Sequence, residues 1–220
     1  MKIIIPLYDL SYYSTVLRVC QRYGARCVIV LNINSGPGAR KDETWESRIK
    51  SLAATGCKLI GYIDAMKWPD DGRVKVAAPR IATSSEMLSE RKDWITWYNV
   101  QFFFYDDIIK DTGIPSCAAK GDFLNFGTKP FANVPAGMIA VVWEKANYAG
   151  KKVEIISGDT AVFALNVKDY GATVEVAKKE NIKFLFCTDR NDKKPDGTDD
   201  WTTYNDLPSW FEDFCKKVPV

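Results

Sequence analysis

Short apolar runs recur along the chain, and several of them are continuous rather than alternating. Continuous apolar runs are typical of strands buried on both faces, as in parallel sheets that helices cover. Some of the intervening segments space their apolar residues as a helix does. The pattern predicts eight strands, at residues 3–8, 27–33, 58–63, 101–107, 122–127, 138–144, 160–167 and 182–189.

Helices are predicted between several of these strands. One covers residues 11–23 and ends at Gly24, and others cover 84–98 and 174–180. Another is indicated by the helical spacing of Trp45, Ile49 and Leu52, with Gly56 as its stop signal.

Strands that alternate with helices predict an α/β protein, and we expect a compact (β/α)8 barrel of TIM type formed by a single domain, residues 1–220. An open doubly wound sheet is the alternative. The connection between Asp107 and Asp122 is short and contains Gly113 and Pro115, so a full helix is not expected there. The barrel would then have a reduced fourth crossover.

Charge and composition narrow the chemistry. The chain has 220 residues, 30 basic and 28 acidic, so its net charge of +2 predicts neither a nucleic-acid nor a membrane partner. It has no histidine, so any acid/base chemistry falls to Asp, Glu, Tyr, Lys or Cys. The six scattered cysteines include no CxxC pair, which favours buried free thiols. No cofactor and no metal site are expected.

The apolar run at the start is too short for a signal peptide or a membrane span, which indicates an intracellular chain or a missing targeting segment.

The predicted fourth strand gives the strongest chemical signal. Its aromatic run from Phe102 to Tyr105 changes abruptly to Asp106 and Asp107. In α/β folds the carboxyl ends of strands carry the site, and other predicted strands also end in polar residues. Two carboxylates that face each other are the minimum for cleaving a glycosidic bond, and we pair Asp106 with Glu144. The alternative for each acid is a helix cap or a solvent-facing side chain.

Phosphate chemistry has weaker support. The turn from Asn34 to Gly38 could carry backbone N–H groups to a ligand, but it lacks the Lys and the spacing of a phosphate loop. A flavin or nucleotide enzyme on an open sheet is therefore a third and weaker reading.

Nine motifs run along the whole chain: IPLY at 5–8, LNINSGPG at 31–38, GYID at 61–64, WY at 97–98, DD at 106–107, NFGT at 125–128, VWE at 142–144, TD at 188–189 and LPSW at 207–210. In order and approximate spacing they resemble the spherulin-4-like family, which is related to glycoside hydrolase family 135. The resemblance implies a (β/α)8 barrel that cleaves an α-1,4-linked, galactosamine-containing polysaccharide. It also suggests an extracellular or cell-surface location.

The resemblance also implies roles for individual residues. Asp106 would be the nucleophile, Glu144 the general acid/base and Asp107 a supporting acid. The chain departs from the family pattern at three places: Asp107 replaces a Glu, Phe102 replaces a Gly and Phe126 replaces a Pro. The expected sugar contacts, from the resemblance and from the polar strand ends together, are Tyr8, Asn32, Asn34, Tyr62, Asp64, Asn125, Thr188 and Asp189.

Two functions remain open from the sequence. A retaining hydrolase acting on a polysaccharide or oligosaccharide predicts carboxyl groups about 5–5.5 Å apart, whereas about 6.5–9.5 Å would indicate inversion. The other function is a catalytically inactive barrel that binds carbohydrate or assembles with itself. A cleft filled by Phe102 or Phe126, or large exposed apolar patches, would favour that second function.

Overall fold

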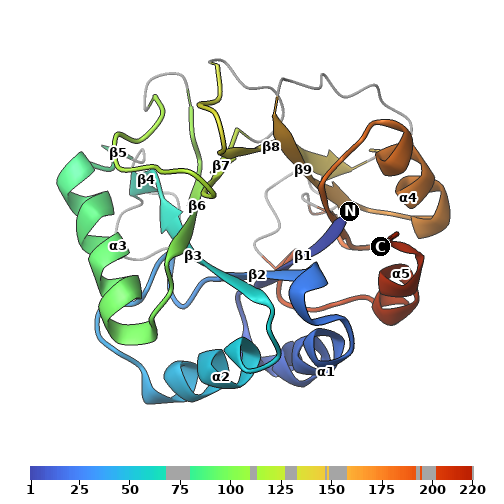
Figure 1. Cartoon of the computed structure of the whole chain (residues 1–220), viewed down its shortest axis with the longest axis horizontal. Coiled ribbons are helices and arrows are strands. Elements are labelled where there is room, and N and C mark those ends of the chain that lie inside the picture. The colour runs from blue at the N-terminus through green and yellow to red at the C-terminus, as the bar shows by residue number, and fades with distance from the viewer. Residues whose placement is uncertain are drawn as a thin grey trace.

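A closed barrel of eight parallel strands forms the centre of the molecule (Figure 1). The computed structural model describes residues 1–67, 80–109, 113–126, 133–146, 148, 158–191, 194 and 202–219. Each barrel strand falls on a predicted apolar run, and the closed order excludes the open sheet. Around the barrel the order is β1 (Lys2–Leu7), β10 (Phe184–Cys187), β9 (Asp159–Leu165), β8 (Ile139–Ala146), β7 (Phe123–Asn125), β6 (Phe102–Asp106), β3 (Lys58–Asp64) and β2 (Cys27–Leu31).

Aromatic rings fill the barrel interior. Phe104 of β6 stacks on Phe123 of β7 and meets Phe163 of β9 edge-on, with ring centroids 6.3 and 5.8 Å apart. Phe163 in turn contacts Phe186 of β10 at 5.8 Å. Residues directly opposite each other on neighbouring strands share a face, so these rings identify which side of each strand points inward. Because side chains alternate along a strand, the positions of these rings also show which polar residues at the strand ends point into the mouth of the barrel.

Helices surround the barrel (Figure 1). The segment predicted at 11–23 is a short 3-10 helix, η1 (Leu10–Tyr12), followed by α1 (Tyr13–Tyr23) and a second 3-10 turn, η2 (Gly24–Arg26). The other predicted helices are α2 (Glu43–Ala53), α3 (Ser84–Tyr98) and α4 (Tyr170–Lys179). The pattern did not predict α5 (Phe211–Lys217) or the hairpin of β4 (Met66–Lys67) with β5 (Arg80–Ile81).

Two helices show why their boundaries lie where they do. The Thr83 side chain accepts the N–H of Glu86, and the Glu86 carboxylate accepts the N–H of Thr83, so a capping box fixes the start of α3. Asp169 accepts the Ala172 N–H at 3.0 Å and starts α4 four residues before the predicted position. Within the described residues, no helix has the length and apolar character needed to cross a bilayer.

Residues 113–122, between β6 and β7, form turns in place of a helix. Arg91 of α3 reaches over the Phe103 ring and donates to the Asp122 carboxylate at 2.8 Å. The same carboxylate accepts the N–H groups of Phe103 and Ala119, both at 2.9 Å. Asp122 therefore ties this connection to β6 and α3.

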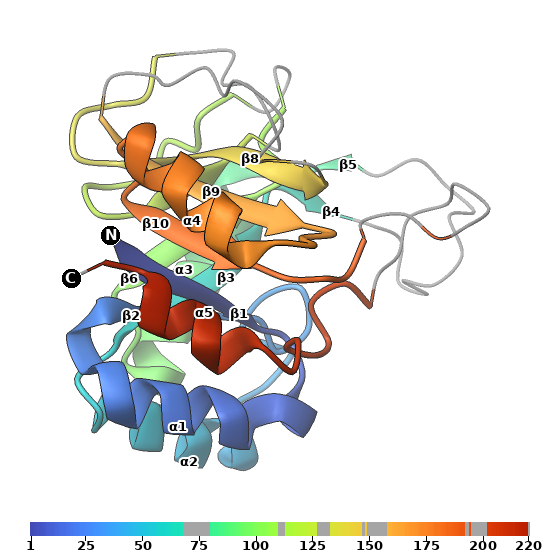
Figure 2. The same ribbon diagram turned by 90° about the vertical axis from the view of Figure 1, so that its right-hand side faces the viewer.

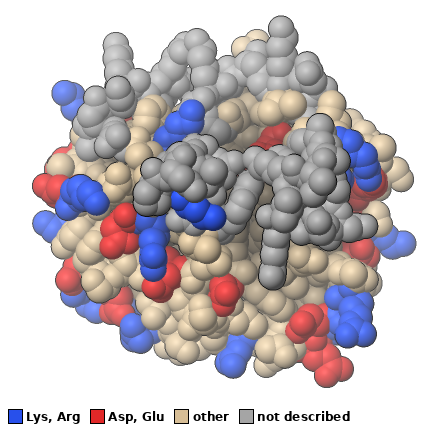
Figure 3. Space-filling view, turned by 180° about the vertical axis from the view of Figure 1, so that it is seen from behind, with Lys and Arg blue, Asp and Glu red and all other residues tan. Residues whose placement is uncertain are grey.

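The carboxyl ends of the barrel strands lie at one side of the molecule. In Figure 2 the arrowheads of β8 and β9 point to the right-hand side, where β4 and β5 also lie. Figure 3 views the molecule from this side, and acidic side chains are visible beside the grey atoms. All six cysteines are free thiols, and five of them are buried.

Candidate active site

Asp106 and Glu144 meet through one amide group. Asp106 ends β6, Asn125 ends β7 and Glu144 lies near the end of β8. The Nδ2 of Asn125 donates to Oδ1 of Asp106 and to Oε2 of Glu144. Because both oxygens accept from the same nitrogen, they lie within about 6 Å of each other, the sum of two ordinary hydrogen bonds. The pair predicted from the sequence is therefore brought together.

A β-bulge turns Glu144 into the barrel. On β8, Val141 is opposite Asn125 and shares its inward face. Strict alternation would then point Trp143 inward and Glu144 outward. The register with β9 shifts between Val141 and Trp143, so Glu144 is opposite the inward ring of Phe163. The extra residue re-aims the side chains, and the carboxylate reaches the mouth.

Tyrosines hold the outer oxygens of both acids. The Tyr62 hydroxyl donates to Oδ2 of Asp106 at 2.7 Å, and the Tyr204 hydroxyl donates to Oε1 of Glu144 at 2.6 Å. The Tyr8 ring lies edge-on to both, with centroids 5.6 Å from Tyr62 and 5.4 Å from Tyr204. Tyr8, Tyr62 and Asn125 are thus at the predicted site, whereas sequence reasoning missed Tyr204.

The two acids have different electrostatic surroundings. Burial raises the pKa of Asp106, but hydrogen bonds from Tyr62, the Asp107 N–H and Asn125 oppose that rise. For Glu144, burial and then the neighbouring charge of Asp106 raise the pKa to about 8. The raised pKa favours the protonated form of Glu144 at neutral pH, and Asp106 accepts one more hydrogen bond than Glu144 does. Two carboxyl groups with environments this different are suited to separate acid and base roles.

Two further acids lie next to Asp106. Asp64 is directly opposite Asp106 on β3 and shares its inward face. It is 3% exposed, accepts the Met66 N–H at 2.8 Å, and burial raises its pKa to about 8. Asp107 is exposed, has a φ of +54°, and donates its backbone N–H to Oδ1 of Asp106 at 2.9 Å. Asp107 therefore supports Asp106 through its backbone.

Among the described residues, the side-chain hydrogen bonds of Asn32 and Thr188 are made with backbone N–H groups and not with the two acids. Asn32 uses its side-chain oxygen to accept the Gly36 N–H at 3.1 Å, which closes the predicted turn, and Asn34 is exposed on that turn. Thr188 is fully buried, and its hydroxyl accepts the Arg190 N–H at 3.2 Å. Thr188 and Asn32 thus have structural bonds of their own.

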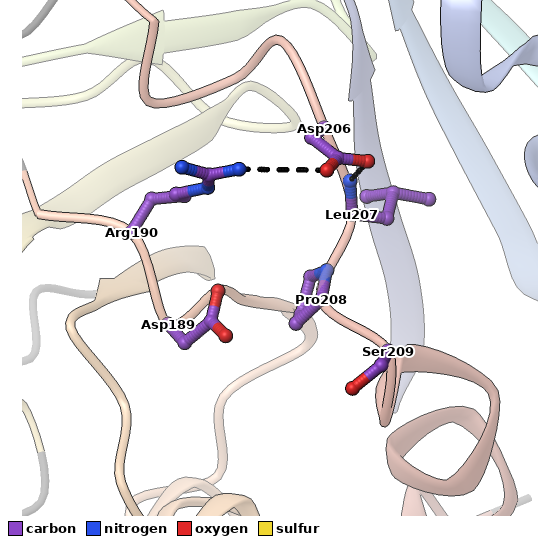
Figure 4. A pocket seen from close by; sticks show the side chains of 6 residues that line it. All are labelled: Asp189, Arg190, Asp206, Leu207, Pro208 and Ser209. Carbon is purple, nitrogen blue, oxygen red and sulfur yellow. Dashed lines mark hydrogen bonds and ion pairs between the residues drawn. The ribbon is translucent and has the colours of Figure 1, made fainter.

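Asp189 lines a separate pocket of about 330 Å³ (Figure 4). Arg190 forms one side of this pocket together with Asp189, and the chain from Asp206 to Ser209 forms the other. The Arg190 guanidinium pairs with Asp206 at 3.4 Å. Sequence reasoning placed Asp189 with the sugar contacts, but in the structure its pocket neighbours come from the C-terminal segment.

Phe102 cannot fill the mouth of the barrel. It begins β6, four residues before Asp106, which is roughly 13 Å along a strand at about 3.3 Å per residue. Its ring is 38% exposed and lies under the Lys58 ammonium, 3.7 Å from the centroid. Phe126 follows Asn125 and is half-buried against the core. The expectation that Phe102 could block the cleft is therefore wrong.

Comparison of the chain with protein-family models, with curated proteins and with solved structures found no match. What distinguishes the site is the Asp106–Asn125–Glu144 bridge, with Tyr62 and Tyr204 on its two sides.

Proposed function

We propose that this protein is a retaining glycoside hydrolase acting on an amino-sugar polysaccharide. The observation that carries the proposal is the pair of carboxyl groups bridged by Asn125. Retaining enzymes place these groups about 5–5.5 Å apart, whereas inverting enzymes need about 6.5–9.5 Å to admit water between them. A shared amide nitrogen keeps the facing oxygens within about 6 Å, which favours retention.

The hydrogen bonds divide the roles. Asp106 accepts three hydrogen bonds, which favour its ionised form, so it is the nucleophile that attacks the anomeric carbon. Glu144 gives its proton to the departing glycosidic oxygen as that bond breaks. Glu144 then takes a proton from water, and the water oxygen displaces Asp106 from the sugar. The hydroxyl groups of Tyr62 and Tyr204 stay on the two carboxylates throughout.

Support for the sugar class comes from the sequence resemblance, which implies α-1,4-linked galactosamine units. Tyr8 lies between the two tyrosines that hold the acids, so its ring is placed to contact a sugar. Asp64 lies on the same inward face and adds a polar group for sugar hydroxyls or amines.

We also propose that the barrel is a compact (β/α)8 barrel of TIM type, formed by one domain of residues 1–220. The turns at 113–122 support a reduced fourth crossover, since Asp122 and Arg91 brace that side of β6 where a helix would otherwise pack.

With galactosaminogalactan and related amino-sugar polymers as substrates, Asp106→Asn and Glu144→Gln should each lower turnover by about 10²–10⁴-fold. Glu175→Gln is the matched control, because Glu175 is an exposed α4 residue paired with Lys178. Proton NMR of the first product should show retained anomeric configuration. Turnover that survives both substitutions, or an inverted product, would contradict the assignment.

One observation favours a non-catalytic, carbohydrate-binding barrel. Each carboxyl oxygen of Asp106 and Glu144 already accepts a hydrogen bond from the protein itself, so the two acids are held in place without substrate. Calorimetry with the same polymers separates the two functions. Binding without any release of reducing ends would favour the non-catalytic barrel.

A further inference from the structure

Glu144 depends on a residue from the far end of the chain. Its Oε2 accepts from Asn125, and its Oε1 accepts from the Tyr204 hydroxyl at 2.6 Å. Tyr204 lies after β10, sixty positions from Glu144 in sequence, in the segment of residues 202–209. The barrel strands alone therefore satisfy only one oxygen of this acid.

Segment 202–209 is anchored at several points. The Tyr204 carbonyl accepts the Tyr12 hydroxyl at 2.7 Å, and Tyr12 also bonds to the Pro6 carbonyl at the end of β1. The Thr203 hydroxyl donates to the Asn191 carbonyl at 2.7 Å, and Leu207 is buried. Such anchors restrict the hydroxyl of Tyr204 to one position.

The ring of Tyr204 closes the top of the aromatic core. It contacts Phe163 of β9, Phe186 of β10 and Tyr8, with centroids 6.3, 5.9 and 5.4 Å away. These contacts fix the ring independently of the hydroxyl. Removing the hydroxyl alone should therefore leave the ring in place.

We propose that Tyr204 is a positioning residue that orients Glu144 and stabilises its carboxylate once the proton has left. Segment 202–209 thereby completes the site, and the proposal's catalytic meaning rests on the proposed hydrolase function. Among the described residues, the charged and titratable groups that act on Glu144 are Asp106 at the end of β6, Asp107 directly after it, Tyr8 after β1 and Tyr204 itself. Of these, Tyr204 donates a hydrogen bond to it.

The hydrogen bond from Tyr204 determines in which direction the pKa of Glu144 changes when the hydroxyl is removed. A donor to a carboxylate favours the ionised form, so the Tyr204 hydroxyl opposes the increase in pKa that burial and Asp106 cause. In Tyr204→Phe the pKa of Glu144 should rise, roughly by one unit, because a hydrogen bond to a charged group is lost. Glu144 becomes a weaker proton donor, so kcat should fall by up to about tenfold, with KM little changed, when protonation of the leaving oxygen limits turnover.

The test measures the proton directly. The full chain is labelled with ¹³C at glutamate side-chain carboxyl carbons, and the signal missing in Glu144→Gln identifies Glu144. Its titration is followed in wild type, in Tyr204→Phe and in Tyr148→Phe. Tyr148 is the matched control, because its hydroxyl bonds to the Glu180 carboxylate at the same 2.6 Å but at the end of α4. The pH profile of hydrolysis is measured on the same three proteins.

An upward shift of the Glu144 titration in Tyr204→Phe, absent in Tyr148→Phe, supports the proposal, and the basic limb of kcat should move with it. An unchanged titration in a folded Tyr204→Phe protein overturns the proposal even if wild type hydrolyses the polymer. If the titration of Glu144 shifts in Tyr204→Phe but none of the three proteins hydrolyses the polymer, the link from Tyr204 to Glu144 is supported and only the hydrolase function is overturned. If Tyr204→Phe does not fold, the same titration is measured in Tyr12→Phe, which loses the hydrogen bond to the Tyr204 carbonyl. The pKa of Glu144 should then rise by a smaller amount, and an unchanged pKa would count against the proposal.

Discussion

Asp64 is a buried acid that the proposed mechanism does not use as a proton donor or nucleophile. Burial is the main reason that its pKa is raised to about 8, and the nearby charge of Asp106 adds to the effect. The unfolded chain loses this proton near pH 4, but the folded chain keeps it until about pH 8. Ionisation of Asp64 therefore lowers the free energy of unfolding progressively between about pH 4 and about pH 8, and above that its contribution no longer changes.

We expect Asp64→Asn to remove this part of the pH dependence. Asparagine cannot ionise, and its oxygen can still accept the Met66 N–H. At about pH 4 the variant and wild type should have similar free energies of unfolding, whereas at pH 8.5 the variant should be more stable by roughly 1.4 kcal/mol or more. Urea unfolding at both pH values measures the difference. Asp159→Asn, at an exposed position, is the control. An equal difference at both pH values would show that Asp64 ionises normally in the folded protein.

Single residues show how far sequence could define the site. Asp106, Asn125 and Glu144 were found because each lies at the end of a predicted strand, where a barrel gathers its polar groups. Tyr204 could not be found this way, because it is held by Tyr12 and by rings of three other elements rather than by a strand. The sequence pattern also gave no sign of the β-bulge in β8, because strict alternation along that strand would point Glu144 away from Asn125.

At the scale of elements, α3 packs closely on β3 at Gly61. Gly61 of β3 faces the ring of Trp94, and a Cβ at Gly61 would lie 2.7 Å from that ring. Trp94 is fully buried and donates its Nε1–H to the Tyr62 carbonyl at 2.8 Å. The absence of a side chain at Gly61 therefore lets α3 approach the strand that carries Tyr62 to Asp106.

Gly61→Ala should separate these two elements. The added methyl group overpacks the contact, so the free energy of unfolding should fall by about 1–3 kcal/mol, and displacement of Tyr62 should also lower hydrolysis. In Gly56→Ala the Cβ meets no atom within 4 Å, and only the φ of +80° opposes the change, at about 1 kcal/mol. Chemical denaturation of both variants gives the comparison. Equal losses, with hydrolysis intact in Gly61→Ala, would contradict the packing argument.

Elements with strong local signals were predicted well. The α3 bounds agree with the pattern because a capping box and a left-handed Asn99 mark its two ends. The seven residues of α5 lack a side-chain cap, and they follow a segment rich in turn-forming residues. The two strands of the hairpin have two residues each, too few to show the alternation of apolar and polar positions that predicts a strand. Tertiary contacts rather than local sequence determine these elements.

For the whole molecule, closure of the barrel depends on the pairing of its first and last strands. The register pairs only Lys2 with Phe184 and Ile3 with Leu185 across this seam, whereas β1 and β2 pair from Ile3 to Leu7. Both chain ends and α5 lie beside the seam in both ribbon views (Figures 1 and 2). The ring of Phe211 contacts Phe186 of β10 at 5.9 Å and Phe214 at 5.4 Å.

We therefore expect α5 to hold the seam closed. Phe214 is fully buried, so Phe214→Ala should lower the free energy of unfolding by about 3–5 kcal/mol. Hydrogen exchange should accelerate most in peptides from β1 and β10, because few ladder bonds remain there once α5 loosens. Phe102→Ala, at a position 38% exposed, should cost about 1 kcal/mol or less and leave the seam protected. Acceleration by the same factor in β2 and β3 would mean that the barrel opens as one unit, and the seam would then have no separate role in its stability.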